Sequence, residues 1–170
     1  GGLCATLGIG LVHVHNVSAC RDGLLTALAA LDLPFGYTVH DVNAGCPTIT
    51  FLGPDGMYCG AQTDPAACGA CLAAQPAFAG VDIVAWREAH RTLVERASFL
   101  IAPSRWAADT LARYYPSARV RVVPHGIPEA AARHAGTRTA VLLPDDGVPT
   151  VAVLGAVGPD KGARRIERLV

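Results

Sequence analysis

Short apolar runs alternate with helix-patterned segments along most of this sequence, and that alternation restricts the folds open to it. Residues 11–15 and 36–40 have the composition of two strands, and residues 99–102 and 119–123 of two more. Between the first two strands, leucines recur at helical spacing: Leu24, Leu25, Leu28 and Leu31. Strands that alternate with helices over short connections build βαβ units. We therefore predict an α/β fold, a Rossmann-like parallel sheet with flanking helices.

Two more helices are expected around the strand at 99–102. One resumes near Val84, and its apolar stripe consists of Trp86, His90, Leu93, Val94 and Ala97. The other runs through Tyr115, with Ser104 as the N-cap whose hydroxyl accepts from a free backbone N–H. Residues 41–80, in contrast, are rich in Gly, Pro and Cys and show no clear period. We predict a long irregular loop there.

A change of composition late in the chain predicts two domains. Residues 129–148 are rich in Ala, Arg and Thr and weakly patterned, as a linker would be, and residues 150–154 then read as a new strand. The predicted division is a first domain over 1–128, a linker over 129–148 and the start of a second Rossmann-like domain over 149–170.

Composition and charge exclude some functions. Hydrophobic residues make up 51% and charged residues 16% of the 170, which is enough for a sizeable core and argues against disorder. Fourteen basic residues balance fourteen acidic ones, so the chain lacks the basic footprint of a general nucleic-acid binder. The apolar opening, residues 3–14, is shorter than the roughly 20 residues of a membrane span.

Four cysteines form the most specific local pattern, and all of them lie in the irregular segment. Their spacing is C-x12-C-x8-C-x2-C, at Cys46, Cys59, Cys68 and Cys71. A long loop without regular structure usually has a function or is held by a cross-link. A zinc ion bound by four thiolates would be such a cross-link. A structural zinc is therefore one prediction, with disulfides or free thiols as the alternatives. A closed sulfur site has no open coordination position, so we assign it no catalytic role.

Polar residues end the first two strands. His40 and Asp41 close the second, and His15 and Asn16 close the first. Open α/β sheets bind ligands beyond the carboxyl ends of their strands, where a His can donate to or accept from a substrate hydroxyl. We take His40 and Asp41 as catalytic candidates, with a packed His and a capping Asp as the alternative. His13 reads as a core histidine with a polar partner.

Polar residues also follow the next two strands, at the same edge of the predicted sheet. Arg105, next to the capping Ser104, could line a substrate pocket, and His125 and Gly126 close the next strand.

A glycine-rich turn at residues 155–162 could hold a phosphate. Gly155, Gly158 and Gly162 would let the backbone approach it, and Lys161, the chain's single lysine, would supply charge. The turn is neither a Walker A motif nor a G-x-G-x-x-G fingerprint. An ordinary βα turn with a surface lysine is the alternative.

In their order and spacing, these segments together resemble family 4-type (group 1), retaining glycosyltransferases of the GT-B fold. Within that family, they resemble the subset with a cysteine cluster after the His-Asp pair. The segments that carry the resemblance are 13–16, 34–41, 46–47, 86–88, 102–104, 122–127, 154–155 and 161–162. It implies a nucleotide-diphosphate sugar held by the C-terminal domain and a glycan or lipid-linked acceptor on the N-terminal one. It further implies that His40 lies near the transferring sugar, that Lys161 contacts the diphosphate, and that no catalytic divalent metal is needed.

The resemblance also sets expectations for the parent protein, a hexosyltransferase-type enzyme. The family's first glycine-rich loop and its later acidic motif have no counterpart here, and Ala156 stands where an arginine is common. We therefore expect both domains to be incomplete and this chain to be inactive alone. Bacterial members commonly build cell-surface polysaccharide. A cytoplasmic location is expected, with peripheral association with the inner membrane, through the full-length protein, as an option.

Two other readings stay open at this point. One is a non-catalytic α/β binding module stapled by zinc. The other is a different α/β enzyme, an epimerase or hydrolase using His40 and Asp41, although the G-x-S-x-G elbow of nucleophilic hydrolases is absent from the sequence.

Overall fold

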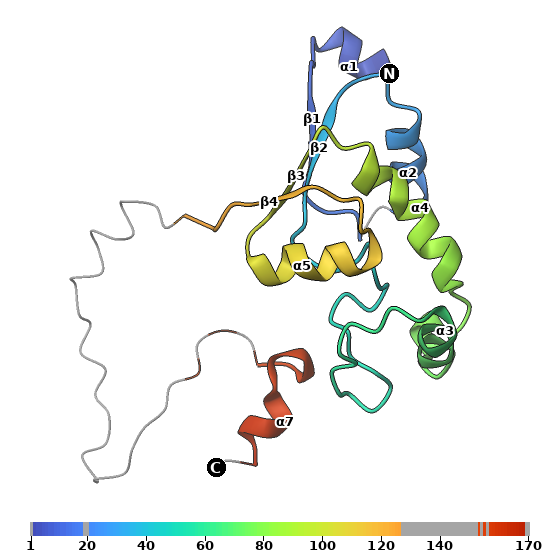
Figure 1. Cartoon of the computed structure of the whole chain (residues 1–170), viewed down its shortest axis with the longest axis vertical. Helices are drawn as coiled ribbons and strands as arrows, with labels where there is room; N and C mark the ends of the chain where they lie inside the picture. The colour runs from blue at the N-terminus through green and yellow to red at the C-terminus, as the bar shows by residue number, and fades with distance from the viewer. Residues whose placement is uncertain (1, 19–20, 127–152, 154, 156, 169–170) are drawn as a thin grey trace, which may run out of the picture. The chain divides into compact units, whose positions relative to one another are not determined.

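The computed structural model describes residues 2–18, 21–126, 153, 155 and 157–168 (Figure 1). The chain divides into two compact units, Gly1–Pro124 and His125–Val170, and each is described by itself. The predicted linker and most of the predicted strand at 150–154 lie outside the described residues. The domain boundaries proposed from composition therefore stay a prediction.

The first unit is built on a four-stranded parallel sheet (Figure 1). The strands follow one another in space in the order of the chain: β1 (Val12–Val14), β2 (Phe35–Thr38), β3 (Phe99–Ala102) and β4 (Val120–Val122). All three pairings are parallel, and in register Val14 lies beside Tyr37 and Tyr37 beside Leu100. The predicted α/β fold with a Rossmann-like parallel sheet is confirmed.

Helices between the strands cover the apolar face of this sheet. They are α2 (Arg21–Ala29), α4 (Ile83–Glu95) and α5 (Arg105–Tyr114), and a short α1 (Gly2–Thr6) precedes β1. Side chains alternate between the faces of a strand, so the registered residues Val14, Tyr37 and Leu100 share one face. They form the core together with Leu28, Leu93 and Leu111 of the three helices.

Two helices begin where a side chain caps them. Ser104 Oγ accepts a hydrogen bond of 3.2 Å from the backbone N–H of Ala107, which confirms the predicted cap of α5. Asp82 Oδ1 accepts bonds of 2.8 and 3.2 Å from the N–H groups of Val84 and Ala85 at the start of α4. Both caps satisfy N–H groups that a helix leaves without intrahelical partners.

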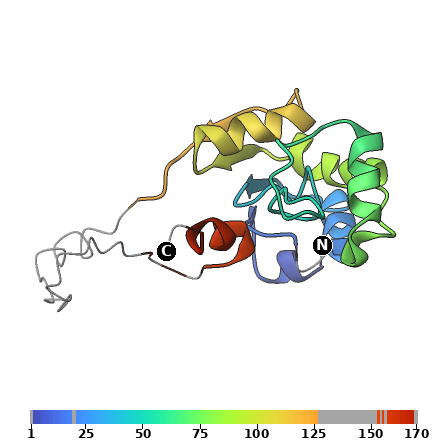
Figure 2. The same cartoon turned by 90° about the horizontal axis from the view of Figure 1, so that it is seen from below.

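The segment predicted to be irregular contains a helix that the sequence reading missed. It is α3 (Pro65–Ala73), followed by a 3₁₀ turn, η1 (Pro76–Phe78). Figure 2 shows α3 beside α4, against which it packs. Most of its residues are small, so no apolar stripe marks it in the sequence. The available signal was the Asp64-Pro65 pair, because Asp64 caps the helix and Pro65 occupies its first position.

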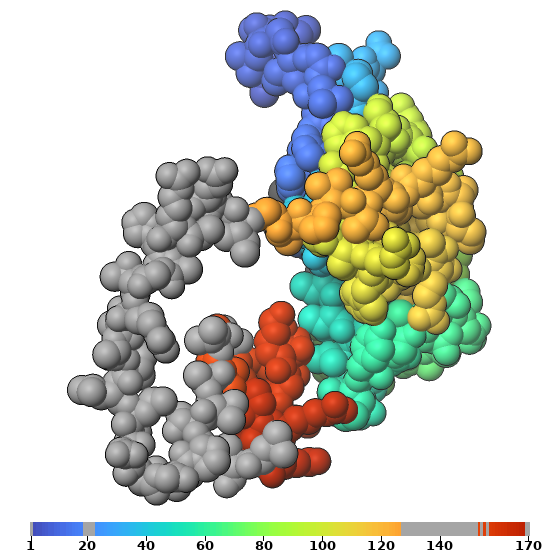
Figure 3. Space-filling model, turned by 60° about the vertical axis from the view of Figure 1, so that its left-hand side comes forward, coloured from blue at the N-terminus to red at the C-terminus, as the bar shows by residue number. Residues whose placement is uncertain are grey.

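The rest of that segment is a loop with an isolated antiparallel bridge between Leu52 and Tyr58. It packs against α5, as the space-filling view shows (Figure 3), through hydrogen bonds to the loop's backbone. Arg113 Nη1 donates to the Gly60 carbonyl at 2.8 Å, and the Tyr114 hydroxyl donates to the Gln62 carbonyl at 3.0 Å.

In the second unit, the described residues form a 3₁₀ turn, η2 (Pro159–Lys161), and a short helix, α7 (Ala163–Ile166). Among the helices described in either unit, none is both long and apolar enough to cross a membrane.

Candidate active site at the carboxyl edge of the sheet

Two histidines meet at the carboxyl edge of the sheet, although 25 residues separate them in the sequence. His15 follows the last residue of β1, and His40 lies two residues beyond the end of β2. His15 Nδ1 and His40 Nε2 share a hydrogen bond of 3.0 Å, and their rings stack with centroids 5.3 Å apart. Both side chains are exposed, so a substrate can reach them. Two of the predicted site residues are thus brought into direct contact.

His13 extends this cluster along the same face of β1. Its Nε2 lies 2.9 Å from the Thr38 hydroxyl, and its ring centroid lies 4.1 Å from that of His15. Desolvation, followed by the charges of His15 and His40, lowers the pKa of His13. His13 was predicted to be a core residue, and this is wrong for its burial: the side chain is exposed. The physical reason is its position on the edge strand β1, on the face opposite the apolar core.

Asp41 and Asn16 shape the turns that follow β2 and β1. Asp41 Oδ1 accepts a bond of 2.9 Å from the Asn43 backbone N–H. Asn16 Oδ1 accepts bonds of 2.8 and 2.7 Å from the backbone N–H and hydroxyl of Ser18. In both turns, the side-chain oxygen accepts from the backbone N–H two residues further along the chain. Their proposed roles in catalysis and substrate binding stay predictions.

Side chains of α4 hold the turn after Asp41 through contacts with Asn43. Asn43 is fully buried, its carbonyl accepts a bond of 2.7 Å from Trp86 Nε1, and its Oδ1 lies 3.1 Å from His90 Nε2. His90 Nδ1 lies 2.8 Å from the Trp86 carbonyl, so the buried imidazole links the turn to the helix backbone. Asn43 Nδ2 is a buried amide nitrogen without a hydrogen-bond partner in the described structure.

Two further side chains support the same turn. Arg87 Nε donates to the Gly45 carbonyl at 3.0 Å, and the buried Tyr115 hydroxyl lies 2.8 Å from the Ala44 carbonyl. Gly45 is required, because a Cβ there would lie 2.7 Å from the ring of Tyr114. The sequence analysis placed Trp86 on the apolar stripe of its helix and Arg87 in a segment of the family resemblance, and it assigned no site role to either residue or to Tyr115. Their partners lie more than 25 residues away, so spacing alone could not reveal these contacts.

Ser104 and Arg105 lie where β3 passes into α5, at the same edge of the parallel sheet as His15 and His40. The Ser104 hydroxyl caps α5, and Arg105 is exposed. Their contact with substrate stays a prediction. His125 and Gly126 fall at the start of the second unit.

The glycine-rich turn of the second unit has the backbone that its sequence suggests. Gly155 and Gly162 have φ of +101° and +81°, a region that strains any residue with a Cβ. Lys161 Nζ lies 3.7 Å from Asp160 Oδ2, and its side chain is 68% exposed. Gly158 precedes η2 in extended conformation. The predicted grip of Gly155, Gly158, Lys161 and Gly162 on a phosphate stays a prediction.

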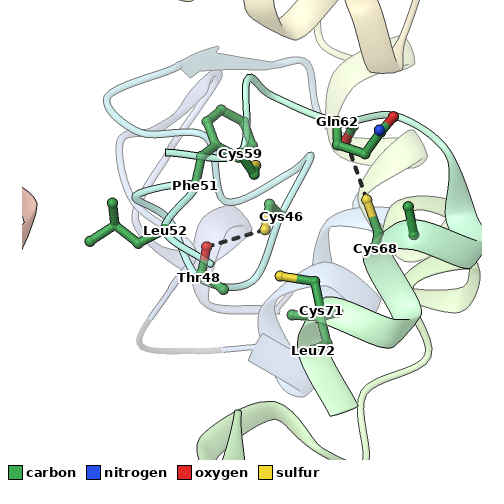
Figure 4. A pocket seen from close by; sticks show the side chains of 10 residues that line it. Cys46, Thr48, Phe51, Leu52, Cys59, Gln62, Cys68, Cys71 and Leu72 are labelled. Atoms are coloured by element: carbon green, nitrogen blue, oxygen red, sulfur yellow. Dashed lines mark hydrogen bonds between the residues drawn. The ribbon is translucent and has the colours of Figure 1, made fainter. Parts of the chain in front are cut away.

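The four clustered cysteines line one cavity of about 210 Å³ (Figure 4). Its wall is otherwise formed by Thr48, Phe51, Leu52, Gln62, Ala67 and Leu72. All four are free thiols: Cys46 Sγ lies 3.2 Å from the Thr48 hydroxyl, and Cys68 Sγ donates to the Gln62 carbonyl at 3.3 Å. Burial raises the pKa of Cys46, and hydrogen bonds from Thr48 oppose that rise.

In their present orientations these thiols are not a metal centre. Across the residues that the structure describes, no group of three or more His, Cys, Asp and Glu side chains is arranged to hold a metal ion as it stands. The cluster is nevertheless gathered on one cavity from three separate pieces of chain.

Comparison with known proteins agrees with the resemblance noted in the sequence. The family described as Glycosyltransferase Family 4 matches residues 3–130, which is most of the 170-residue chain. No curated protein matches the chain, and neither does a solved structure. The matched region contains the whole parallel sheet, the cysteine cavity and the cluster of His13, His15 and His40. The chain therefore belongs to glycosyltransferase family 4.

Proposed function

We propose that this chain is part of a retaining, hexosyltransferase-type enzyme. That enzyme transfers a sugar from a nucleotide-diphosphate sugar to a glycan or lipid-linked acceptor. Membership of the family supports a transferase with a sugar donor and an acceptor. The observation that carries the proposal is the contact between His15 and His40 at the carboxyl edge of the sheet. That edge is where open α/β folds bind their ligands.

The hydrogen bond between His15 and His40 links the protonation of the two ring nitrogens of His40. One proton lies between His15 Nδ1 and His40 Nε2, so one nitrogen donates and the other accepts. If His15 donates, the neutral His40 carries its own proton on Nδ1. If His40 donates, Nδ1 is an acceptor. In both cases His15 determines what His40 offers to the substrate.

The donor diphosphate is assigned to the glycine-rich turn of the second unit. Lys161 is exposed, its ammonium is 3.7 Å from a single carboxylate, and exposed pairs of this kind are weak. A diphosphate can therefore compete for the ammonium through a charge-assisted contact. Catalysis would be mainly electrostatic, since cationic and N–H groups stabilise the leaving diphosphate as the glycosidic bond breaks. No divalent metal is required in this scheme.

The proposed setting is the synthesis of bacterial cell-surface polysaccharide, by a cytoplasmic protein or one peripheral to the inner membrane. We propose that the acceptor site lies on the first unit and that the 170-residue chain alone does not catalyse sugar transfer. Neither a zinc-stapled module without chemistry nor an epimerase or hydrolase is favoured, because the family match brings a transferase domain.

Calorimetry with UDP and GDP as ligands of the full-length protein tests the donor assignment. We expect saturable binding, weakened by about 1–3 kcal/mol in Lys161→Ala, the usual contribution of a charge-assisted contact. Arg121→Ala is the matched control, since it removes an exposed cation of the first unit. Absence of binding by the folded protein would overturn the proposed function, and equal losses in both variants would overturn the role of Lys161.

A further inference from the structure

The cysteine-rich loop holds several residues in a strained backbone conformation. Three of its residues other than glycine have positive φ: Ile49 at 56°, Phe51 at 57° and Ala61 at 55°. Such conformations are strained and persist only where the surroundings hold them. The apolar cluster of the loop is small, with Val42, Phe51 and Ala61 as its buried members. A further interaction among the loop's side chains would add to the hydrogen bonds that already reach its backbone.

The four thiols are placed to supply that interaction. Cys68 and Cys71 are three residues apart on α3, so they share one face of the helix. Cys46 and Cys59 come from the loop, on either side of the bridge between Leu52 and Tyr58. All four line the same cavity, whose volume of about 210 Å³ leaves room for the thiols to turn. Four sulfur ligands, one pair at C-x2-C spacing, are the ligand set of structural zinc.

A cation already contacts this cavity. Arg87 Nη2 donates to Cys68 Sγ at 3.2 Å, and the guanidinium is stacked 4.7 Å from the centroid of the Tyr114 ring. Zinc bound by four thiolates carries a net negative charge, which an N–H···S bond from arginine offsets. The neighbouring side chains thus suit the charged form of the cluster.

The same arginine connects the cavity to the catalytic turn. Its Nε donates to the Gly45 carbonyl at 3.0 Å, and its Nη1 donates to the Thr63 carbonyl at 2.7 Å. Gly45 lies four residues beyond Asp41 and directly before Cys46. One guanidinium therefore binds the cysteine cluster, the loop backbone and the turn that follows His40.

We propose that the four-cysteine cavity binds one zinc ion as a closed structural site, and that Arg87 transmits this constraint to the turn carrying His40 and Asp41. On binding, each of the four thiols loses its proton to solvent and its sulfur becomes a zinc ligand. Cys46 and Cys68 must exchange their present partners, Thr48 and Gln62, for the metal. Rotation about χ1 moves each Sγ without moving the backbone. The site needs no substrate and is independent of the proposed transferase chemistry.

Metal content tests the site directly. The chain, purified in reducing buffer and exposed to zinc, is expected to retain about one equivalent after desalting, as a single closed four-thiolate site predicts. With cobalt in place of zinc, it should show the visible absorption of tetrahedral cobalt thiolate. Cys68→Ser and Cys59→Ser should each lose the metal, and Cys4→Ser, which alters a cysteine outside the cavity, should keep it. Well below one equivalent in the folded wild-type chain, or equal loss in Cys4→Ser, would overturn the proposal.

The link to the catalytic turn is tested by the imidazole NMR signals of His40 and His15. Arg87→Gln leaves all four thiols in place, so it should retain zinc and shift both signals. Arg96→Gln, at the C-terminal end of the same helix, is the matched control, because Arg96 donates to the Ala29 carbonyl instead. If Arg87→Gln fails to fold, Arg87→Lys replaces it. Lysine keeps the positive charge but lacks the several N–H donors of the guanidinium. Histidine signals that are unchanged in the folded Arg87 variant would overturn the link.

Discussion

The sheet and the cysteine-rich loop of the first unit are held by different kinds of interaction. The sheet is stabilised by a large apolar cluster that joins the strands to α2, α4 and α5. The loop has a small cluster and depends on side chains that reach its backbone, such as Arg87, Arg113 and Tyr114. Apolar burial is cooperative over the whole core, whereas a few directed bonds can open locally. The loop is therefore the part whose order can be adjusted without unfolding the sheet.

The largest effect is expected where the core is broken. Leu93 is fully buried between α4 and the sheet, so Leu93→Ala removes packed methyl groups and leaves a cavity. We expect a loss of about 2–5 kcal/mol in the free energy of unfolding, measured by urea denaturation. Val84→Ala on the same helix, where the side chain is 59% exposed, should change little. Equal losses would mean that α4 does not pack as described.

Tyr115 joins the two regions, and its removal should have a smaller effect. Its buried hydroxyl lies 2.8 Å from the Ala44 carbonyl and 2.9 Å from the Arg87 carbonyl. Tyr115→Phe keeps the ring and leaves these acceptors without the hydroxyl, at a cost of about 1–3 kcal/mol. Hydrogen exchange should show faster exchange in the turn at 42–46 than in β2. Tyr58→Phe, at a tyrosine that is 53% exposed, is the control.

The same hydroxyl gives a pH signature. Burial raises the pKa of Tyr115, and also those of Tyr37 and Tyr114, well above the ordinary value. A raised pKa means that the unfolded chain loses these protons first as the pH rises. Stability is then fully present below about pH 10, the ordinary tyrosine pKa, and falls above it. Tyr115→Phe should reduce the steepness of that fall, and an unchanged slope would contradict the burial.

The regular region could be predicted from the sequence because its signals are local. The strand at 99–102 was predicted with the bounds it has, and the cap at Ser104 follows from one residue type before a helical pattern. The helix α3 was missed because small residues bury little and leave no stripe. Its capping pair, Asp64 and Pro65, was a weaker signal.

The site was predicted only as far as the strand ends allow. His15 and His40 were both expected at the carboxyl edge, but their hydrogen bond depends on the register of β1 and β2, which no local pattern encodes. The support from Trp86, Arg87 and Tyr115 depends on contacts across more than 25 residues. Spacing grouped the four cysteines, and the fold places them on one cavity, while their ligand stays a proposal.

The smallest effect separates a structural from a functional role at the edge of the sheet. Ser104→Ala removes the cap of α5 and should cost about 0.5–2 kcal/mol, measured by thermal unfolding. Ser104→Asp should restore most of this loss, because a carboxylate accepts the same N–H group. Ser98→Ala, at an exposed serine before β3, is the control for removing a hydroxyl. If the stable Ser104→Asp variant of the full-length enzyme also keeps its transferase activity, the hydroxyl acts only as a cap. If stability returns and the activity does not, Ser104 contributes to the acceptor site as well, and the edge of the sheet combines both roles in one residue.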